Sequence, residues 1–351
     1  MSPSIRDVAE RAGVSVGTVS NVLNRPERVA AATRAQVLAA IEELGFVRNS
    51  SAAQLRAGAS RSLGLIALDL ANPFFQDVAR GVEEVATELG YAVVLCNSDE
   101  QAAREERYLR VLEEQRVRGV LITPVESGSE RLDPLRRRGT PIVLVDRHDP
   151  RVNCCSVAVD DVVGGELAGA HLVALGHRRI TYFCGPLGLR QCADRLDGLR
   201  RAVAAGGLDP DEAIDVVEIA ELKARTGYEA ARRIFDVERP GHGATAALCA
   251  NDLLALGVLR AAVATGRRVP DDIALIGYDD IEFAADAAVP LSSVRQPTRQ
   301  IGRTAAQLLM EECDHPDIHA HQQVMFRPEL VVRDSTGPHA TSPHPDSAAL
   351  A

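Results

Sequence analysis

Short apolar segments that alternate with amphipathic helical segments constrain the fold of this chain more than any other feature of its sequence. The apolar segments form two groups, Leu63–Leu68, Tyr91–Cys96, Val120–Thr123, Ile142–Val145 and Val157–Val159, then Ile180–Phe183, Val216–Ile219, Ala246–Cys249 and Ile273–Ile276. The helical segments between them include Asp77–Leu89, Arg104–Gln115, Gly164–Leu175 and Thr226–Phe235. Strands that are apolar throughout and separated by helices are typical of parallel sheets covered on both faces. The sequence therefore predicts an α/β protein with two doubly wound lobes.

Residues 4–24 predict two short helices joined by a tight turn. In the first helix, apolar side chains at positions i, i+3, i+4 and i+7 form one face, made of Ile5, Val8, Ala9 and Ala12. Ser4 and Asp7 have the spacing of a capped helix start. Gly13 allows the backbone conformation that is common where a helix ends.

The second helix presents small and polar side chains on its outer face. Ser15 can cap its start, and Val19, Val22 and Leu23 point inward. The opposite face holds Val16, Gly17, Thr18, Ser20 and Asn21. A helix-turn-helix uses such a second helix to enter the DNA major groove. A purely structural helical hairpin is the alternative.

An ordered set of motifs over nearly the whole chain resembles the lactose-repressor (LacI/GalR) family of bacterial transcription regulators. The N-terminal motifs are Ile5-Arg6-Asp7-Val8-Ala9, Gly13-Val14-Ser15 and Thr18-Val19-Ser20-Asn21-Val22-Leu23-Asn24. The later motifs are Asn72-Pro73-Phe74-Phe75, Asp146-Arg147, Leu175-Gly176-His177-Arg178, Gly227-Tyr228, Ala250-Asn251-Asp252, Ile276-Gly277-Tyr278-Asp279-Asp280 and Gln296-Pro297. The resemblance implies an N-terminal all-α helix-turn-helix domain followed by a two-lobed, periplasmic-binding-protein-like core of doubly wound parallel sheets.

The expected domains follow from this resemblance and from composition. We expect the helix-turn-helix domain at 1–48, a hinge helix or linker at 49–61, and the effector-binding and dimerisation core at 62–335. Lobe 1 is expected at about 62–161 plus 294–324, and lobe 2 at about 162–293 plus 325–335. Residues 336–351, rich in Pro, His, Ser and Ala, are expected to be a disordered tail. A third helix is expected to open with a capping box of Thr33 and Gln36 and to end at Gly45.

The segment 49–60 is a linker of small residues by composition alone. In the family, this segment is a hinge helix that folds on operator DNA and inserts a leucine into the minor groove, a wedge whose unstacking cost is offset by new contacts. Leu55 occupies that position, and Arg56 can contact phosphate. The chain departs from the family at Arg48, where proline is common, and at Ala53, where a basic residue is usual.

The charge distribution favours DNA binding by the N-terminal part. Residues 1–61 hold 8 Arg and 5 Asp or Glu, an excess of +3, whereas the remainder holds 31 basic and 44 acidic residues, an excess of −13. A basic head on an acidic body can meet phosphates with one end only. Val16 can touch a thymine methyl group and Asn21 can pair with adenine, whereas Gly17 has no side chain for base readout. The expected DNA-binding residues are Ser15, Val16, Gly17, Thr18, Ser20, Asn21, Asn24, Arg25, Leu55 and Arg56.

Polar and aromatic residues follow the predicted strands, at the edge where doubly wound sheets bind ligands. Carboxylates, amides and guanidinium groups suit paired hydroxyls, and an aromatic face suits a sugar ring, so the sequence predicts a sugar site between the lobes. The resemblance implies effector roles for the positions matching Phe74, Arg195, Asp252 and Asp279. The full expected set is Asp69, Phe74, Phe75, Asp146, Arg147, Gln191, Arg195, Asn251, Asp252 and Asp279. Each Asp could instead cap a helix.

Other chemistries have weak support. The sequence has no Gly-x-Gly-x-x-Gly after a strand, no phosphate-cradling loop and no Gly-x-Ser-x-Gly, so we expect no cofactor, no catalytic residues and no enzyme activity. The seven cysteines are expected to be buried thiols, with a redox pair at Cys154-Cys155 as the alternative. Cys313, His315, His319 and His321 have loosely metal-like spacing, but a solvated loop is the favoured interpretation and no metal is expected.

Together these features predict a homodimeric repressor that binds a palindromic operator and controls a carbohydrate-utilisation operon. A small sugar or sugar derivative would switch its operator affinity in either direction. No apolar run approaches the length of a membrane span and no secretion signal is present, so we expect a cytoplasmic protein without a membrane partner. The alternatives are a solute-binding protein without a DNA role and a sugar-acting enzyme.

Overall fold

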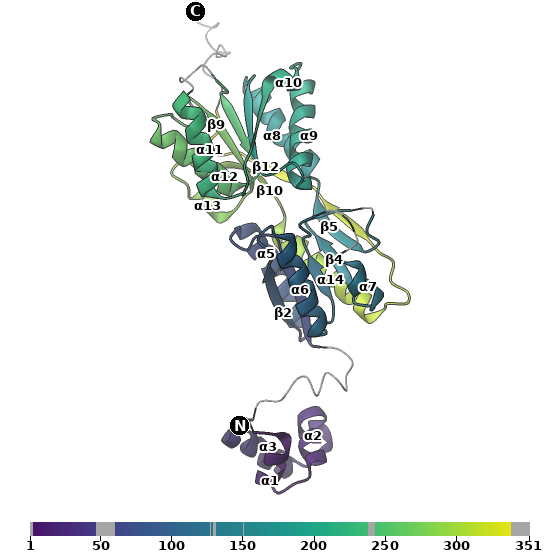
Figure 1. The fold of residues 1–351 in the computed structure, drawn as a ribbon. Helices are drawn as coiled ribbons and strands as arrows, with labels where there is room; N and C mark the ends of the chain where they lie inside the picture. Colours follow the sequence, from purple (N-terminus) through teal and green to yellow (C-terminus); the bar gives the residue numbers. More distant parts are fainter. Residues whose placement is uncertain are drawn as a thin grey trace, which may run out of the picture. The chain divides into compact units, whose positions relative to one another are not determined.

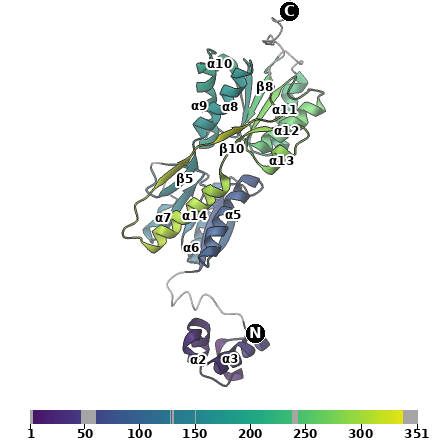
Figure 2. The ribbon, with the colours of Figure 1, turned by 180° about the vertical axis from the view of Figure 1, so that it is seen from behind.

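A computed structural model describes residues 3–46, 60–126, 128, 131–149, 151–237 and 243–337. The chain divides into two compact units between Ser60 and Arg61. Figures 1 and 2 show both units from opposite sides. None of the helices in these ranges has the length and apolar character that a bilayer span requires.

The N-terminal unit is a small helical fold. It consists of α1 (Ile5–Arg11), α2 (Val16–Asn24), the 3-10 turn η1 (Pro26–Arg28) and α3 (Ala31–Leu44). Val8, Val19 and Val37 are fully buried in its core, one from each α-helix. The predicted capping box of Ser4 and Asp7 forms at the start of α1. Burial of one apolar face of each helix therefore builds this unit.

The start of the third helix differs from the prediction. α3 begins at Ala31, before Thr33, and no side chain caps its N-terminus. Val29 packs against the small core, and Ala30 after it is extended (φ −55°, ψ 140°). The helix therefore starts without the expected Thr33–Gln36 capping box, shortly after a residue that is held against the core, while Gly45 ends the helix as predicted, with φ 59°.

The C-terminal unit contains two six-stranded sheets, which confirm the predicted pair of doubly wound lobes. The first has the order β11-β5-β4-β3-β1-β2 and the second β12-β10-β9-β8-β6-β7. In the first sheet the strands are β1 (Ser62–Ala67), β2 (Ala92–Asn97), β3 (Val120–Ile122), β4 (Ile142–Val145), β5 (Cys155–Val159) and β11 (Gln323–Phe326). In the second they are β6 (Ile180–Cys184), β7 (Ile214–Glu218), β8 (Ala246–Cys249), β9 (Ala274–Asp279), β10 (Ser292–Arg295) and β12 (Glu329–Val331).

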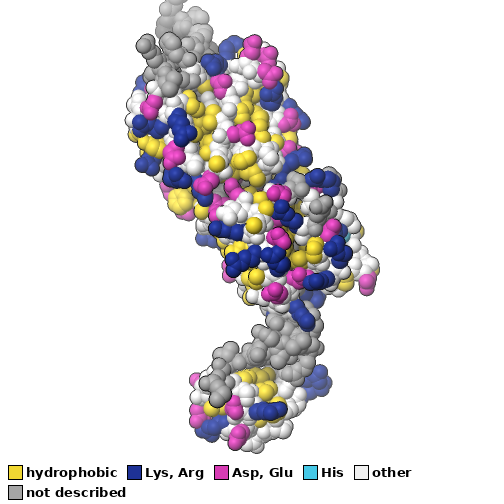
Figure 3. All heavy atoms as spheres, in the orientation of Figure 1, with side chains coloured by type: hydrophobic (Ala, Val, Ile, Leu, Met, Phe, Trp, Pro, Cys, Tyr) yellow, Lys and Arg dark blue, Asp and Glu magenta, His cyan; other side chains and the backbone are white. Residues whose placement is uncertain are grey.

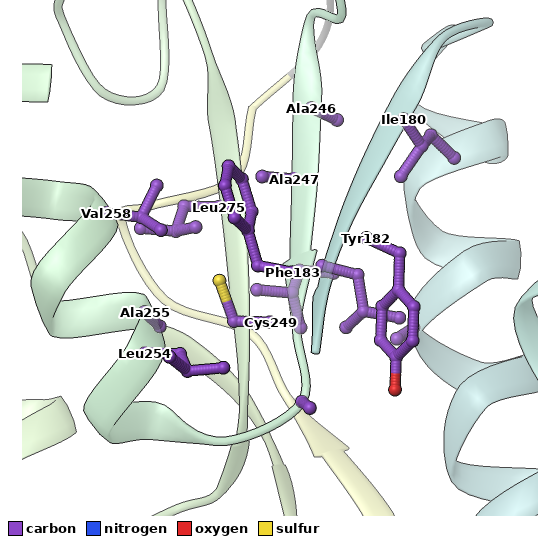
Figure 4. Close-up of a cluster of buried hydrophobic side chains, with 14 of the residues drawn as sticks. Ile180, Tyr182, Phe183, Ala246, Ala247, Cys249, Leu254, Ala255, Val258 and Leu275 are labelled. Carbon is purple, nitrogen blue, oxygen red and sulfur yellow. The ribbon is translucent and has the colours of Figure 1, made fainter. Parts of the chain in front are cut away.

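Burial follows each strand's place in its sheet. Every residue of the interior strands β4 and β8 is buried, whereas the edge strands β2 and β7 are partly exposed. The pairings are parallel apart from β10 with β12. Figure 4 shows the second lobe's core, where Phe183, Cys249, Leu254 and Leu275 pack between the sheet and α12 (Asp252–Ala264). Apolar strands buried on both faces thus specify the parallel sheets.

The helices that cover the sheets pack in close pairs. In the first lobe α5 (Pro73–Glu88) lies beside α14 (Thr298–Asp314), as both views show. In the second lobe α8 (Asp161–Ala174) pairs with α9 (Arg190–Ala205), and α11 (Ala224–Val237) pairs with α12. The shorter or separate helices are α6 (Ala102–Glu114), α7 (Asp133–Arg137), α10 (Pro210–Ala213) and α13 (Glu282–Ala285).

Glycines on facing positions allow these pairs to approach closely. A methyl group on Gly165 of α8 would lie 2.1 Å from the Arg195 carbonyl oxygen of α9, and one on Gly198 would lie 2.0 Å from the Val162 carbonyl oxygen. The same arrangement occurs at α5–α14 and at α11–α12, through Gly81, Gly302, Gly227 and Gly257. Because glycine has no side chain, the backbones of the paired helices can come into direct contact at these positions.

The chain crosses between the two sheets slightly later than the expected lobe boundaries. β10 pairs with β9 up to Arg295, beyond the boundary at 294. β11 pairs with β5 up to Phe326, beyond the boundary at 324. Strand pairing holds these residues in their sheets, so each crossing follows the last paired residue.

The first residues of the expected tail are held by hydrogen bonds. The Thr336 hydroxyl is 3.0 Å from His171 Nε2, and the Gly337 carbonyl oxygen is 3.2 Å from His177 Nε2. The prediction of disorder is therefore wrong for Thr336 and Gly337, because polar contacts to α8 and the loop after it hold both residues. Residues 338–351 lie outside the described ranges.

Charged side chains of both signs are interspersed on the surface, as Figure 3 shows for one face of the C-terminal unit. Many are exposed ion pairs within one helix, such as Arg225 with Glu229 and Arg201 with Asp197. Such pairs contribute little to stability.

Substitution of Gly165 by Ala tests the close packing of α8 and α9. We expect Gly165→Ala to lower the free energy of unfolding by about 1–3 kcal/mol, because the added methyl group overpacks the contact with α9. Gly188→Ala is the matched control, since a methyl group there meets no atom within 4 Å. Chemical unfolding of the two variants measures the difference, and equal stability would contradict this account.

Candidate nucleic-acid interface and interlobe pocket

The outer face of α2 carries the side chains expected to read DNA. The Ser15 hydroxyl accepts a hydrogen bond from the Thr18 backbone N–H at 3.1 Å and lies 2.9 Å from the Thr18 hydroxyl. These bonds begin the helix as predicted, while Val19 and Val22 turn into the core. Capping and an apolar inner face thus leave the opposite face of α2 to solvent.

The exposed residues of α2 and its C-cap Arg25 differ in whether their side chains form hydrogen bonds within the protein. Asn24 Nδ2 donates to the Ser20 carbonyl oxygen at 2.7 Å and contacts the Ser20 hydroxyl at 3.2 Å. Val16 is 41% exposed, and Gly17, Asn21 and Arg25 are exposed as well. The side chains of Asn21 and Arg25 make no hydrogen bond or ion pair within the described ranges, so both are free to meet a partner. Leu55 and Arg56 lie outside those ranges.

A pocket lies between the two lobes at the carboxyl ends of their strands. The cavity itself is small, about 30 Å³, and is partly open to solvent. Its lining residues from the first lobe are Leu68, Asp69, Asn72, Phe74, Phe75, Glu100 and Asp146, and those from the second are Gln191, Arg195, Leu222, Asn251 and Asp279. This is the edge at which doubly wound sheets bind ligands.

Asp279 joins the two sides of the pocket. Its Oδ2 accepts a hydrogen bond from Asn72 Nδ2 at 3.0 Å, and its Oδ1 accepts one from Gln296 Nε2 at 2.8 Å. Asn72 belongs to the first lobe, where its Oδ1 also caps α5 by accepting from the Phe74 backbone N–H. Asp279 has a φ of 102°, a sparsely populated conformation that is common at functional sites.

Arg195 is the one cationic residue of the lining and is itself fully engaged. Its Nε donates to Asp161 Oδ1 at 2.8 Å, and its Nη1 donates to the Ala250 carbonyl oxygen. Its guanidinium carbon lies 3.6 Å from the centroid of the Tyr278 ring. These contacts hold the buried side chain in one orientation.

Two lining atoms are buried and have no hydrogen-bond partner in the described structure, Gln191 Oε1 and Asp146 Oδ1. Both atoms can accept hydrogen bonds. A buried acceptor without a donor costs about 1–3 kcal/mol. A ligand with hydroxyl groups would supply the missing donors.

Three carboxyl groups of the pocket, those of Asp146, Glu100 and Asp279, have raised pKa values. Burial, with a smaller contribution from the negative charge of Asp161, raises the pKa of Asp146 to about 8. Burial also raises the pKa of Glu100 to about 7 and that of Asp279 to about 6. Perturbed carboxyl groups in a cleft are typical of functional sites.

Phe74 and Phe75 serve both the core and the pocket. Their rings meet edge to face with centroids 4.9 Å apart. Both side chains are buried in the first lobe's apolar cluster and both line the pocket. The aromatic surface of the pocket therefore rests on a packed core.

The structure brings most of the expected effector residues together, but not Arg147 and Asp252. Arg147 is buried outside the lining and its Nη2 donates to the Pro124 carbonyl oxygen at 3.0 Å. Asp252 accepts hydrogen bonds from the Ser293 hydroxyl at 2.7 Å and from the Ile281 backbone N–H at 2.9 Å. Those bonds hold the Asp252 carboxyl group against Ser293 of β10 and the Ile281 backbone after β9, and Asp252 is not among the residues that line the pocket.

The pocket also contains residues that the sequence analysis did not select, Leu68, Asn72, Glu100 and Leu222. Asn72 had a detectable signal, because an Asn directly before Pro73 is a typical cap for the helix that follows. Leu68, Glu100 and Leu222 carry no such pattern, since only the fold brings their loops to the cleft.

Comparisons with known families cover both units of the chain. The family "Bacterial regulatory proteins, lacI family" matches residues 4–49, and "Periplasmic binding protein-like domain" matches residues 170–336. The HTH-type transcriptional repressor PurR of Photobacterium profundum is 34% identical over 95% of this chain and 98% of its own length. The HTH-type transcriptional regulator DegA of Bacillus subtilis is 34% identical over 96% of this chain and 99% of its own length.

Solved structures show the same architecture. The lac repressor dimer bound to operator and the anti-inducer ONPF matches 96% of this chain and 100% of its own, with a TM-score of 0.81 and 29% identity. The transcriptional regulator CelR in complex with cellobiose matches 95% of this chain and 100% of its own, with a TM-score of 0.69 and 32% identity. A LacI family transcriptional regulator from Enterococcus faecium with bound ribose matches 79% of this chain and 99% of its own, with a TM-score of 0.72 and 26% identity.

This chain matches both family models, and its relatives are named HTH-type transcriptional regulators, so the alternatives of a solute-binding protein without a DNA role and of an enzyme are both set aside. The chain belongs to the lacI family of bacterial regulatory proteins and is a DNA-binding transcriptional regulator.

Proposed function

We propose that this regulator is a cytoplasmic repressor of a carbohydrate-utilisation operon, which binds a palindromic operator as a homodimer and responds to a small neutral sugar. The observation that carries the proposal is the interlobe pocket, in which Asp279 accepts hydrogen bonds from Asn72 and Gln296 while Gln191 and Asp146 offer unpartnered acceptors. A ligand that binds these groups acts on both lobes at once.

The DNA side of the proposal rests on the free side chains of α2. Val16 and Asn21 would reach base edges, Gly17 would allow close approach, and Arg25 would meet phosphate. Ser15, Thr18, Ser20 and Asn24 would contact the DNA backbone near the helix, and Leu55 and Arg56 keep the hinge role that the family resemblance implies. A two-fold symmetric dimer matches a palindromic site.

The effector side rests on the chemistry of the lining. Asp69, Glu100, Asp146 and Asp279 place carboxyl oxygens that can accept hydrogen bonds in the lining, whereas Arg195 is already paired with Asp161. The hydroxyl groups of a neutral polyol donate hydrogen bonds to such a site, and an anionic ligand would be repelled by the carboxyl groups that are ionised. The solved relatives with cellobiose and ribose are consistent with this class. Arg147 and Asp252 would support the pocket from behind through their contacts to its loops.

Operator titration with and without sugars tests the proposal. Purified protein is titrated onto DNA from upstream of its own gene at fixed salt, because phosphate contacts make the affinity salt-dependent. Pentoses, deoxyhexoses and hexoses are then added singly. We expect one neutral sugar to change the operator affinity, and its sign identifies an inducer or a co-repressor. Specific operator binding whose affinity is unchanged by every sugar would contradict the proposal that a sugar is the effector.

Asn21→Ala tests base readout by α2. We expect a loss of about 5- to 150-fold in affinity for the operator, because a bidentate contact to adenine is worth about 1–3 kcal/mol of discrimination. Affinity for scrambled DNA should change little. Fluorescence anisotropy measures both, and Gln36→Ala, which removes an exposed amide from α3, is the matched control. Equal losses on operator and scrambled DNA would contradict base readout.

Gln191→Ala tests the pocket. We expect about a 10-fold loss of sugar affinity, because one hydrogen bond to a buried acceptor contributes about 1.5 kcal/mol. Operator affinity without sugar should stay unchanged, since Gln191 belongs to the C-terminal unit and lies outside the helix that we propose reads DNA. Calorimetric titration measures the sugar affinity, and Gln115→Ala, exposed on α6's C-terminal end, is the control. An unchanged sugar affinity would move the site elsewhere.

The raised pKa values predict how stability and sugar binding depend on pH. In the folded protein Asp279, Glu100 and Asp146 keep their protons up to about 6, 7 and 8, whereas in the unfolded chain they lose them near pH 4. The folded state thus binds more protons between about pH 4 and 8, so the stability of the sugar-free protein falls as the pH rises through this window.

A sugar whose hydroxyl groups donate hydrogen bonds to these carboxylates favours their ionised form. Sugar binding should therefore release protons at pH 7 and strengthen from pH 6 to 8. Calorimetry in two buffers of different ionisation enthalpy measures the release, and Asp146→Asn should reduce it. Asp286→Asn, at an exposed position on the second lobe, should not. Proton uptake on binding would contradict the assignment.

A further inference from the structure

Four side chains with metal-binding chemistry meet at the far end of the first lobe's sheet. Cys155 comes from β5, Glu312 from α14, and His319 and His321 from the loop between α14 and β11. One ligand atom from each lies within 4.8 Å of all the others. Cys155 lies more than 150 positions before the other three residues in the sequence, so only the fold brings it to them.

The distances fit a tetrahedral ion. Cys155 Sγ lies 3.0 Å from His319 Nε2 and 3.9 Å from His321 Nδ1, and His321 Nδ1 lies 3.9 Å from Glu312 Oε2. Ligand atoms around a tetrahedral zinc ion are about 3.4–3.6 Å apart, given Zn–S of about 2.3 Å and Zn–N of about 2.0–2.1 Å. The observed separations lie on both sides of this value, so small side-chain rotations bring the four atoms to one ion.

The carboxylate of Glu312 has no Arg or Lys partner in the part of the chain that the structure describes. Its Oε2 is buried and has no hydrogen-bond partner, and its only ion-pair contact within the described ranges is His321. Buried carboxylates are normally paired with a cation or bound to a metal. A divalent ion with one thiolate, one carboxylate and two neutral imidazoles makes a site of zero net charge.

The surroundings hold the ligands in place. The Gln322 backbone N–H donates to Cys155 Sγ at 3.3 Å, a bond that helps to orient the sulfur atom. The His319 backbone N–H donates to the His315 carbonyl oxygen at 2.9 Å and closes a turn. This turn returns the loop toward β5, where Gln323 pairs with Ser156.

The cluster differs from the one that the sequence spacing offered. Cys313 is buried elsewhere, with its thiol donating to the Arg118 carbonyl oxygen at 3.3 Å, and His315 lies outside the group. Cys154 packs in a different apolar cluster from Cys155, because neighbouring side chains of a strand point to opposite faces. A Cys154–Cys155 redox pair therefore has no support, and Cys155 is available to a metal.

We propose that Cys155, Glu312, His319 and His321 bind one zinc ion. Four protein ligands leave no open coordination position, so the site is structural. The ion ties the end of α14 and the loop after it to β5, and so fixes the start of β11. This inference is independent of the operator and of the sugar.

Metal analysis of the full-length protein, with any purification tag removed, tests the site. After dialysis against a chelator, the protein is equilibrated with zinc and its metal content is measured. We expect one zinc ion per chain and a rise in melting temperature that the chelator reverses. Cobalt in place of zinc should show a thiolate charge-transfer band and the intense visible bands of tetrahedral coordination.

His319→Ala and His321→Ala change partly exposed side chains, so both variants should fold. Each should weaken zinc binding by at least about 100-fold, since loss of a residue that only holds a metal ligand in place already lowers metal affinity by about 10- to 100-fold. Cys155→Ala should remove the charge-transfer band. His315→Ala, in the same loop but outside the cluster, is the matched control. Zinc far below one per chain, cobalt without a thiolate band, or an equal loss in His315→Ala would overturn the proposal.

Discussion

The hydrogen bonds of the Asp279 carboxylate hold the interlobe pocket together. Asn72 donates from the first lobe and Gln296 donates from a connection between the lobes. A buried carboxylate carries a large desolvation cost, which these donors offset only while the lobes stay in this arrangement. A ligand that competes for the same oxygens changes the balance between lobe arrangements. The ligand binds the two lobe arrangements with different affinities. The free-energy difference between these affinities is the largest amount by which the ligand can change the affinity of the DNA-binding unit for its operator.

Because each lobe is closely packed, a change in the arrangement of the two lobes is expected to occur in the segments that connect them. Facing glycines bring α5 to α14, α8 to α9 and α11 to α12 at backbone contact, and close-packed elements deform little. Arg195 and Gln191 stand on α9, so their positions follow from its contact with α8. The lobes are therefore expected to move as bodies, with the change absorbed where the chain passes from β10 to α14 and from β11 to β12.

The proposed zinc site lies in the first lobe at the starts of β5 and β11, whereas the chain leaves for β12 from the other end of β11. The ion would hold the start of β11 against β5 and so support the strand from which that crossing begins. The site thus supports the lobe in which half of the pocket is built.

Local sequence patterns determined the elements, their class and the family of this protein. Ser4, Asp7 and Ser15 specify helix starts, and the apolar runs specify buried parallel strands, because both effects act over a few residues. Eight of the expected effector residues line the pocket, since strand ends in a doubly wound sheet share one edge. Only the tertiary structure decided that Asn72 and Glu100 join them, that Arg147 and Asp252 do not, and that α3 starts at Ala31. It alone brought Cys155 to His319 and His321. Those outcomes depend on packing and on contacts between residues far apart in the chain, which no short pattern encodes.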